Sequence, residues 1–423
     1  MDNNQSPSFS ELIDRGKLQL KVVNNFNVPI ENATINISYT GNPTQILETI
    51  STDNSGLTEN VELAAPPVEL SLDENNIIQP YSEYTVLVTA DGYEPVDVSG
   101  IEILSGTESM QNITLTPVTP DGRGEDIVIP AHTLYGDYPP KIPEPEIQPV
   151  SESGEIVLSR VVVPETVVVH DGAPSDSTAK NYYVSYTDYI KNVASSEIYA
   201  TWPESTITAN VLAIMSFTLN RVYTEFYRNK GYDFTITSST AYDHKWIHGR
   251  NIFDSISLIV DEIFDQYLAR PNVRQPILTQ YCDGRNVVCS QRGWMSQWGS
   301  KSLGDRGYSP IEIIRNYYGN NMFISTAEQI SGIPASWPGY NLTIGASGDK
   351  VRQLQEQLDA IAEVYTAIPR IAADGIFGQR TQAAVSAFQN IFGLPQTGVV
   401  DFRTWYKISQ IYVGITRIAE LYP

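Results

Sequence analysis

A run of prolines near the end of the first third of the sequence indicates an extended tether between folding units. Eight prolines fall between residues 117 and 150, at positions 117, 120, 130, 139, 140, 143, 145 and 149. Proline fixes its own φ and has no N–H to donate, so such a run suits neither a helix interior nor a central strand. The sequence therefore predicts an extended, exposed and cleavable linker over 117–150, with separate folding units on either side.

Residues 1–116 carry the pattern of an all-β unit. Segments 18–23 (LQLKVV), 33–39 (ATINISY), 84–90 (YTVLVTA) and 112–118 (NITLTPV) alternate or are β-branched, and turn signals lie between them. The order of these segments resembles the small prealbumin-like sandwiches that occur as accessory domains. The resemblance implies a structural or masking role rather than a catalytic one.

Charge is concentrated before the prolines. Residues 1–150 hold 23 Asp and Glu against 5 Lys and Arg, a net −18, whereas the remaining 26 acids and 22 bases leave −4 on residues 151–423. This charge balance disfavours nucleic acid and anionic membranes as partners. The start of the sequence does not read as a secretory signal, and no stretch is apolar enough to insert into a membrane. We expect synthesis in a cytoplasm without the general secretion route.

Residues 341–423 are predicted to form a small helical unit. Val351, Leu354, Leu358 and Ile361 follow the i, i+3, i+7 and i+10 spacing of one helix face. A DGIFG loop at 374–378 precedes a second helix, and a third begins near residue 404. Over 344–411 this pattern resembles the three-helix peptidoglycan-binding module of bacterial wall hydrolases. The resemblance implies a shallow muropeptide groove at this loop, with Asp374, Gly375 and Phe377 as candidate contacts.

Residues 151–335 indicate a mixed α+β unit. Strands are predicted at 161–170 and 181–190, with Asp188 at a strand end. Helices are predicted at 206–228, 256–268 and 310–319 from their apolar periodicity.

One carboxylate in this unit invites a chemical interpretation. Glu197 lies in KNVASSEIYATWP (191–203). If 189–198 is helical, Tyr189, Val193 and Glu197 share a face, and Tyr199 and Trp202 can shield the carboxyl from water. Such shielding raises a carboxyl pKa and lets the group carry a proton near neutrality. The local pattern alone also fits an ordinary surface charge.

Two longer segments favour a catalytic acid over a surface charge at Glu197. DYIKNVASSEIYATWPESTITANVLAIMSFTLNRVY (188–223) and GWMSQWGSKSLGDRGYSPIEIIRNYYG (293–319) together resemble the SpoIID family of lytic transglycosylases. The resemblance implies that Glu197 acts alone as acid and base. It also places Tyr199, Ser296, Gln297 and Trp298 near the sugar. The chain departs from the family at 290–292, where Ser-Gln-Arg replaces Gly-His-Gly, and at Met215, where an arginine is usual.

The whole layout is similar to that of spore cortex-lytic enzymes. This resemblance implies a precursor located in the spore, cortex peptidoglycan as the substrate, and an activating protease of the germination pathway. We expect the cut within or just after the prolines, near 147–153, and no required cofactor.

Four residues outside the two family-like motifs are candidate metal ligands. His244 and His248 are spaced as H-x3-H, and Cys282 and Cys289 as C-x6-C. They are consistent with a structural zinc, a disulfide or free thiols. A zinc set would favour a second function, a muramoyl-alanine amidase that activates water on the metal. A third interpretation is a non-enzymatic wall-binding protein.

Overall fold

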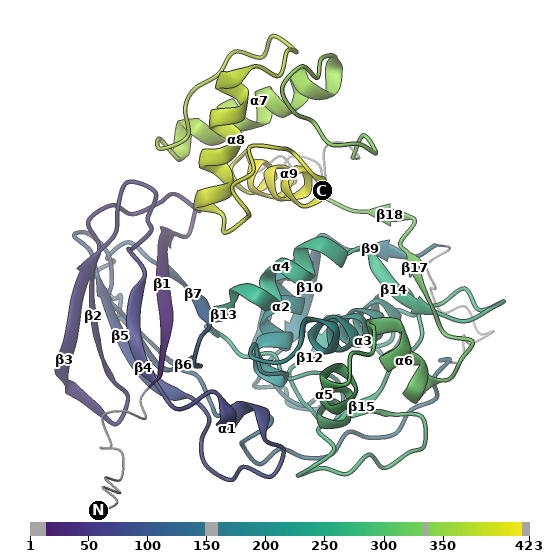
Figure 1. The fold of residues 1–423 in the computed structure, drawn as a ribbon. Coiled ribbons are helices and arrows are strands. Elements are labelled where there is room, and N and C mark those ends of the chain that lie inside the picture. Colours follow the sequence, from purple (N-terminus) through teal and green to yellow (C-terminus); the bar gives the residue numbers. More distant parts are fainter. Residues whose placement is uncertain (1–13, 149–159, 333–336, 417–423) are drawn as a thin grey trace, which may run out of the picture.

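The computed structural model describes residues 14–148, 160–332 and 337–416. It is a mixed α and β molecule in which a β-sandwich, a central unit and a C-terminal helical unit lie against one another (Figure 1).

The N-terminal unit is a sandwich of two sheets. One sheet has the order β3-β2-β5-β6-β8, and the other has the order β13-β7-β1-β4. Their strands are β1 (Asp14–Asn24), β2 (Thr34–Tyr39), β3 (Asn42–Ser51), β4 (Val61–Ala65), β5 (Ser82–Thr89), β6 (Val96–Ile103), β7 (Glu108–Leu115), β8 (Glu125–Val128) and β13 (Ile252–Phe253), and a short helix, α1 (Glu69–Leu72), follows β4. Leu18, Leu20 and Val22 alternate inward along β1 and reach full burial.

The sandwich is completed by strands from outside its own segment. β8 belongs to the predicted linker and pairs in parallel with β6. β13 belongs to the central unit and pairs antiparallel with β7. The sandwich therefore cannot be assigned to residues 1–116 alone, and it is joined to the central unit through a shared sheet (Figure 1).

Residues 117–126 of the proline-rich segment are exposed, as predicted, and so is every proline in its described part. The segment is not a free linker, however, because its later part packs on the central unit. Residues 131–148, which we call the strap, cross the central unit, and His132, Lys141 and Gln148 are buried there. The extended backbone that proline enforces leaves its carbonyls and remaining N–H groups open to a partner. Of the predicted cleavage region 147–153, residues 149–153 lie outside the described residues.

The central unit is built around helix α3 (Glu204–Tyr223), which is buried over most of its length. The other helices are α2 (Tyr186–Glu197), α4 (Asp254–Ile263), α5 (Gln297–Asp305) and α6 (Pro310–Tyr318). Its short strands are β9 (Val162–Val163), β10 (Thr166–His170), β11 (Asn181–Ser185), β12 (Ile236–Thr237), β14 (Gln266–Ala269), β15 (Tyr281–Cys282), β16 (Met295–Ser296), β17 (Phe323–Thr326) and β18 (Gln329–Ile330). One sheet has the order β11-β10-β12, and the remaining strands pair two by two.

Four predicted elements of the central unit have different bounds in the structure. The strand expected at 161–170 is divided into β9 and β10, which belong to different sheets. The strand expected at 181–190 ends at Ser185, whose hydroxyl accepts from the N–H of Asp188 and caps α2. Asp188 therefore lies in a first helical turn rather than at a strand end. The helix expected to reach 228 ends at Tyr223, because Glu225 adopts a positive φ of 48°. The helix expected at 256–268 is divided into α4 and β14.

The C-terminal unit consists of α7 (Asp349–Val364), α8 (Gln379–Ile391) and α9 (Phe402–Thr416). The predicted face of α7 is buried, and Trp405 fills the core with 1% of its surface exposed. The unit touches both others. Tyr365 donates to the Asn27 carbonyl of the sandwich at 3.1 Å, and Phe402 packs on Phe264 of the central unit. None of the helices in the described ranges is long and apolar enough to cross a membrane.

Candidate active site

Glu197 is the last residue of α2 and lies in the interior of the central unit. Its side chain belongs to a residue that is only 3% exposed. Tyr189 and Val193 lie on the same face, as the predicted spacing required, and both are fully buried. The helix stops at Glu197 because Ile198 is extended, so the carboxyl projects from a helix end.

Two donors hold the carboxylate. The N–H of Lys245 donates to Oε1 at 2.6 Å, and the hydroxyl of Tyr281 donates to Oε2. Burial raises the pKa of Glu197 above its ordinary value, although the positive charge of Lys141 and the two donors oppose the rise. The group is therefore poised to bind a proton more readily than an exposed glutamate.

A chain of rings surrounds this carboxyl. Tyr281 stacks on His244 with ring centroids 5.9 Å apart, and the Tyr189 hydroxyl lies 3.0 Å from Nδ1 of His244. Burial holds the pKa of His244 well below its usual range, so the imidazole is neutral. Tyr199 and Trp202, which are predicted to shield the carboxyl, are both buried, and they join Trp298 and His132 in an aromatic cluster.

The second family-like motif lies against the first. Gln297 donates from Nε2 to the carbonyl of Glu197 at 3.1 Å, and Ser296 caps α5 by accepting from the N–H of Gly299. Tyr199, Gln297 and Trp298 are 2%, 4% and 3% exposed. Protein atoms cover all three in the arrangement described, and a ring that covers Tyr199 is that of His132 from the strap, so their contact with a sugar stays a prediction. Gln297 fixes the backbone beneath the carboxyl.

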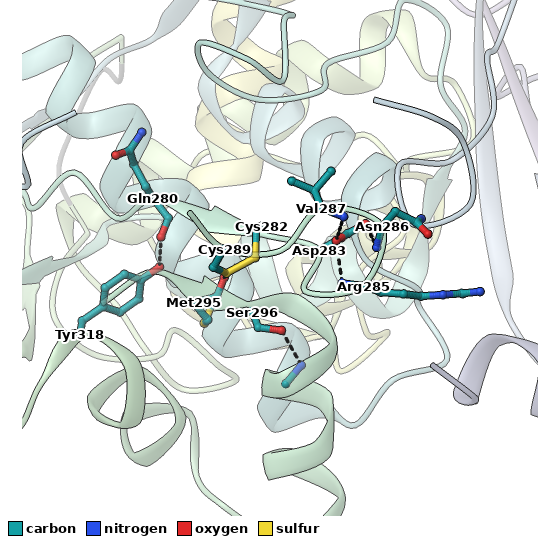
Figure 2. Close-up of a disulfide and its surroundings, with 11 residues drawn as sticks. Gln280, Cys282, Asp283, Arg285, Asn286, Val287, Cys289, Met295, Ser296 and Tyr318 are labelled. Atoms are coloured by element: carbon teal, nitrogen blue, oxygen red, sulfur yellow. Dashed lines mark hydrogen bonds between the residues drawn. A yellow bond between two sulfur atoms is a disulfide. The ribbon is translucent and has the colours of Figure 1, made fainter. Parts of the chain in front are cut away.

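The two cysteines form a disulfide. Cys282 and Cys289 are joined by an S–S bond of 1.98 Å that closes the loop between β15 and β16 (Figure 2). The carboxylate of Asp283 accepts from the N–H groups of Arg285, Asn286 and Val287 within this loop. The loop is thus fixed directly after Tyr281, the residue that donates to Glu197.

The zinc interpretation of the four residues is contradicted. Both sulfurs are consumed in the disulfide, His244 faces Tyr189, and Nε2 of His248 lies 3.3 Å from Glu125. Within the described residues no group of three or more His, Cys, Asp and Glu side chains is placed to hold a metal ion.

The strap brings a lysine to the site that sequence reasoning missed. The ammonium of Lys141 donates to the carbonyl of Asp243 and lies 4.9 Å from the centroid of the Tyr281 ring. Burial lowers its pKa, and the nearby carboxylate of Glu197 acts in the opposite sense. A lysine among prolines gives no local signal of this placement.

A buried ion network adjoins Lys141. Nε of Arg221 donates to Asp243 at 2.7 Å, and its two terminal nitrogens bind Glu144 of the strap at 2.9 and 2.5 Å. Tyr227 and Thr237 donate to the other oxygen of Asp243. Apolar periodicity predicts the helix that carries Arg221. It does not predict the carboxylates of Asp243 and Glu144, which offset the cost of burying the guanidinium.

The candidate wall-binding loop is held by one glutamine. Gln355 donates to the carboxylate of Asp374 at 3.0 Å and accepts from the N–H of Gly375 at 2.7 Å. Gly375 has a φ of +77°, which explains the glycine. Phe377 is fully buried, so the prediction that it meets a muropeptide is wrong, and the exposed apolar side chain of this loop is Ile376.

Comparison with known proteins agrees with this C-terminal architecture. Residues 347–408 match the family model described as "Putative peptidoglycan binding domain". This match covers most of the C-terminal unit. The zinc D-Ala-D-Ala carboxypeptidase of Streptomyces albus G is 40% identical over 76 residues, which are 18% of this chain and 28% of that enzyme. The chain thus spans little more than a quarter of that relative.

Two solved structures also align with parts of the chain. The N-terminal domain of SleB is 30% identical and covers 18% of this chain and 99% of that one, with a TM-score of 0.16. The minor pilin GBS52 of Streptococcus agalactiae is 13% identical and covers 26% of this chain and 48% of that one, with a TM-score of 0.19.

Proposed function

We propose that this chain is the latent precursor of a lytic transglycosylase that cleaves spore cortex peptidoglycan, an enzyme of the SleC type. The observation that carries the proposal is Glu197, a buried carboxyl with a raised pKa where the two SpoIID-like motifs meet. The peptidoglycan-binding family of the C-terminal unit supports the substrate class. Binding of nucleic acid and insertion into a membrane are not part of this function.

The chemistry needs one group that gives and then takes a proton. Protonated Glu197 donates to the oxygen of the bond between MurNAc and GlcNAc, and the GlcNAc leaves as an alcohol. The resulting carboxylate accepts the proton of the muramic C6 hydroxyl while that oxygen bonds to C1. The product is a 1,6-anhydro ring, and no water is consumed. A hydrolase would instead call for a second carboxylate.

The Glu197 carboxyl is held for both halves of this cycle. The Tyr281 hydroxyl and the Lys245 N–H stabilise the carboxylate. Burial stabilises the acid form. The balance brings the two protonation states closer in free energy than they are in an exposed glutamate.

Latency is part of the proposal. The strap covers the surroundings of Glu197 and places Lys141 beside it. A protease of the germination pathway would cut near 147–153 and separate the strap and the acidic sandwich from the catalytic unit. The disulfide removes the thiolates on which a zinc amidase would rely, so that alternative loses its ligands.

Product mass tests the proposal. Cortex treated with the activated chain should release muropeptides with anhydro-muramic ends, each lighter by one water than the hydrolysis product. Glu197→Gln should abolish the release while cortex sedimentation with the protein persists. Glu204→Gln, at an exposed position in the first turn of α3, is the matched control and should retain activity. Intact glycan with freed stem peptides, or full activity in Glu197→Gln, would overturn the proposal.

A further inference from the structure

The strap is held by two buried glutamines that bind its backbone. Gln280 accepts from the N–H of Glu144 at 2.8 Å and donates to the carbonyl of Ile142 at 2.7 Å. Gln275 accepts from the N–H of Gln148 and donates to its carbonyl, both at 3.0 Å. Each side-chain amide thus binds one N–H and one C=O. Gln280 and Gln275 are 2% and 6% exposed.

The strap is also held by two arginines that bind its carboxylates. Arg221 grips both oxygens of Glu144, at 2.9 and 2.5 Å. Arg270 likewise binds both oxygens of Glu146, one of them at 2.7 Å. Two-point contacts of this kind are the strongest that arginine makes with carboxylates.

These contacts follow one another in order along a track that starts at Glu197. Lys141 lies over the Tyr281 ring, Glu144 meets Gln280, and the Glu146 carbonyl accepts from the N–H of Leu278 at 2.9 Å. On the opposite side, the N–H of Ile142 donates to the carbonyl of Ala241 at 2.7 Å. Residues 141–148 therefore lie in a groove between segments 241–243 and 275–281. We call it the strap groove.

We propose that the strap groove is the glycan-binding site of this chain, and that the strap fills it by imitating the glycan. An acetamido group offers the same N–H and C=O as a peptide, so Gln275 and Gln280 are assigned to acetamido groups. Muramic acid and the stem peptides carry carboxylates, so Arg221 and Arg270 are assigned to these. The inference rests on the proposed function and names the substrate contacts of its site.

Removal of the strap leaves the hydrogen-bonding groups of the strap groove without partners. Buried amides without partners are costly, and a glycan lying along the track would satisfy the same donors and acceptors. Arg221 keeps Asp243 at 2.7 Å and the Tyr242 carbonyl at 3.2 Å, so the loss of Glu144 leaves its charge paired. The groove can therefore persist without the strap, and strap and glycan exclude each other.

Binding, rather than turnover, tests the inference. The full chain carrying Glu197→Gln is titrated with a tetrasaccharide of alternating GlcNAc and MurNAc and with chitotetraose, which has acetamido groups but no carboxylates. Adding Glu144→Gln and Glu146→Gln loosens the strap, and affinity for the tetrasaccharide should rise at least tenfold. Chitotetraose should gain less, because it cannot use the arginines. Asp305→Asn, in the exposed Lys301 pair, is the control and should change nothing.

A peptide with the sequence of residues 139–148 should compete with the tetrasaccharide for the strap-loosened chain, whereas a scrambled peptide should not. Gln280→Glu added to that chain should lower tetrasaccharide affinity at least tenfold. If the Gln280→Glu variant does not fold, the result of the peptide competition decides whether the inference holds. Unchanged affinity after loosening, or a peptide that does not compete, would overturn the inference. Failure of the proposed function shows separately, as cortex products without anhydro ends.

Discussion

At the scale of single residues, burial determines what Glu197 can do. Its neighbours are neutral donors and rings, with the cations of Lys141 and Lys245 nearby, and the desolvation of the carboxylate outweighs them. Glu312, another glutamate of the same unit, is exposed and accepts from the N–H and hydroxyl of Ser309, which lowers its pKa. The same side chain thus has opposite pKa shifts at two positions, and the sequence alone does not distinguish them.

The raised pKa of Glu197 predicts how stability varies with pH. The ordinary pKa of a glutamate carboxyl is 4.5, and the pKa of Glu197 in the folded chain is higher. The folded chain therefore binds the carboxyl proton of Glu197 more tightly than the unfolded chain does. The free energy of unfolding therefore falls as pH rises through 4.5 toward the folded pKa, and the loss is complete above that pKa. Glu197→Gln lacks the titration. Its urea midpoint should match the parent at low pH and exceed it progressively as pH rises.

The matched variant Glu312→Gln should behave in the opposite way. The lowered pKa of Glu312 contributes stability above pH 4.5 that is lost as pH falls through the folded pKa. This variant should therefore be less stable than the parent at neutral pH and equal to it in acid. Two variants with the same sign of pH dependence would contradict the assigned pKa directions.

At the scale of elements, the start of α2 is set by one hydroxyl. Ser185 accepts from the N–H of Asp188 at 3.2 Å and also accepts from Gln410 of α9 at 3.0 Å. Ser185→Ala removes the cap and should lower the free energy of unfolding by about 1 kcal/mol, measured by urea denaturation. Ser185→Asn keeps a capping oxygen and should recover most of the loss. Equal losses for both variants would show that the cap contributes nothing.

Elements with a strong period were predictable, and elements defined by partners were not. The α7 face at Val351 and Leu354 is buried as its spacing required. The 181–190 segment was predicted as strand throughout because its tyrosines and valine suit a strand, whereas the Ser185 cap ends the strand there. The strap lacks any period, and its position depends on Gln275 and Gln280, which are far away in sequence.

The candidate site was predictable only in part. Glu197 and its helix face followed from spacing and resemblance. The donor Tyr281 lies 84 residues from Glu197 in the sequence. Lys141, which lies over the Tyr281 ring, comes from the strap. No local sequence pattern predicts contacts of this kind. The cysteines could be paired only once their backbones were placed.

At the scale of the whole molecule, charge should modulate access to the wall. Residues 1–150 carry −18 and residues 151–423 only −4. Under the proposed function, an anionic cortex therefore repels the precursor chiefly through its sandwich. Screening shortens this repulsion to about 10 Å at 0.1 M salt, so it should matter most at low ionic strength.

Neutralising exposed sandwich carboxylates tests this expectation in the intact chain. Glu31, Glu48, Glu59 and Glu74 are exposed and are replaced together by glutamine in a Glu197→Gln background. Sedimentation with cortex should rise severalfold at about 0.02 M salt and converge with the parent near 0.5 M, because screening removes the repulsion. The same four positions changed to aspartate keep their charge and should sediment like the parent. A gain that persists at high salt, or that the aspartate variant shares, would mean that the sandwich acts on wall binding by contact and not by charge.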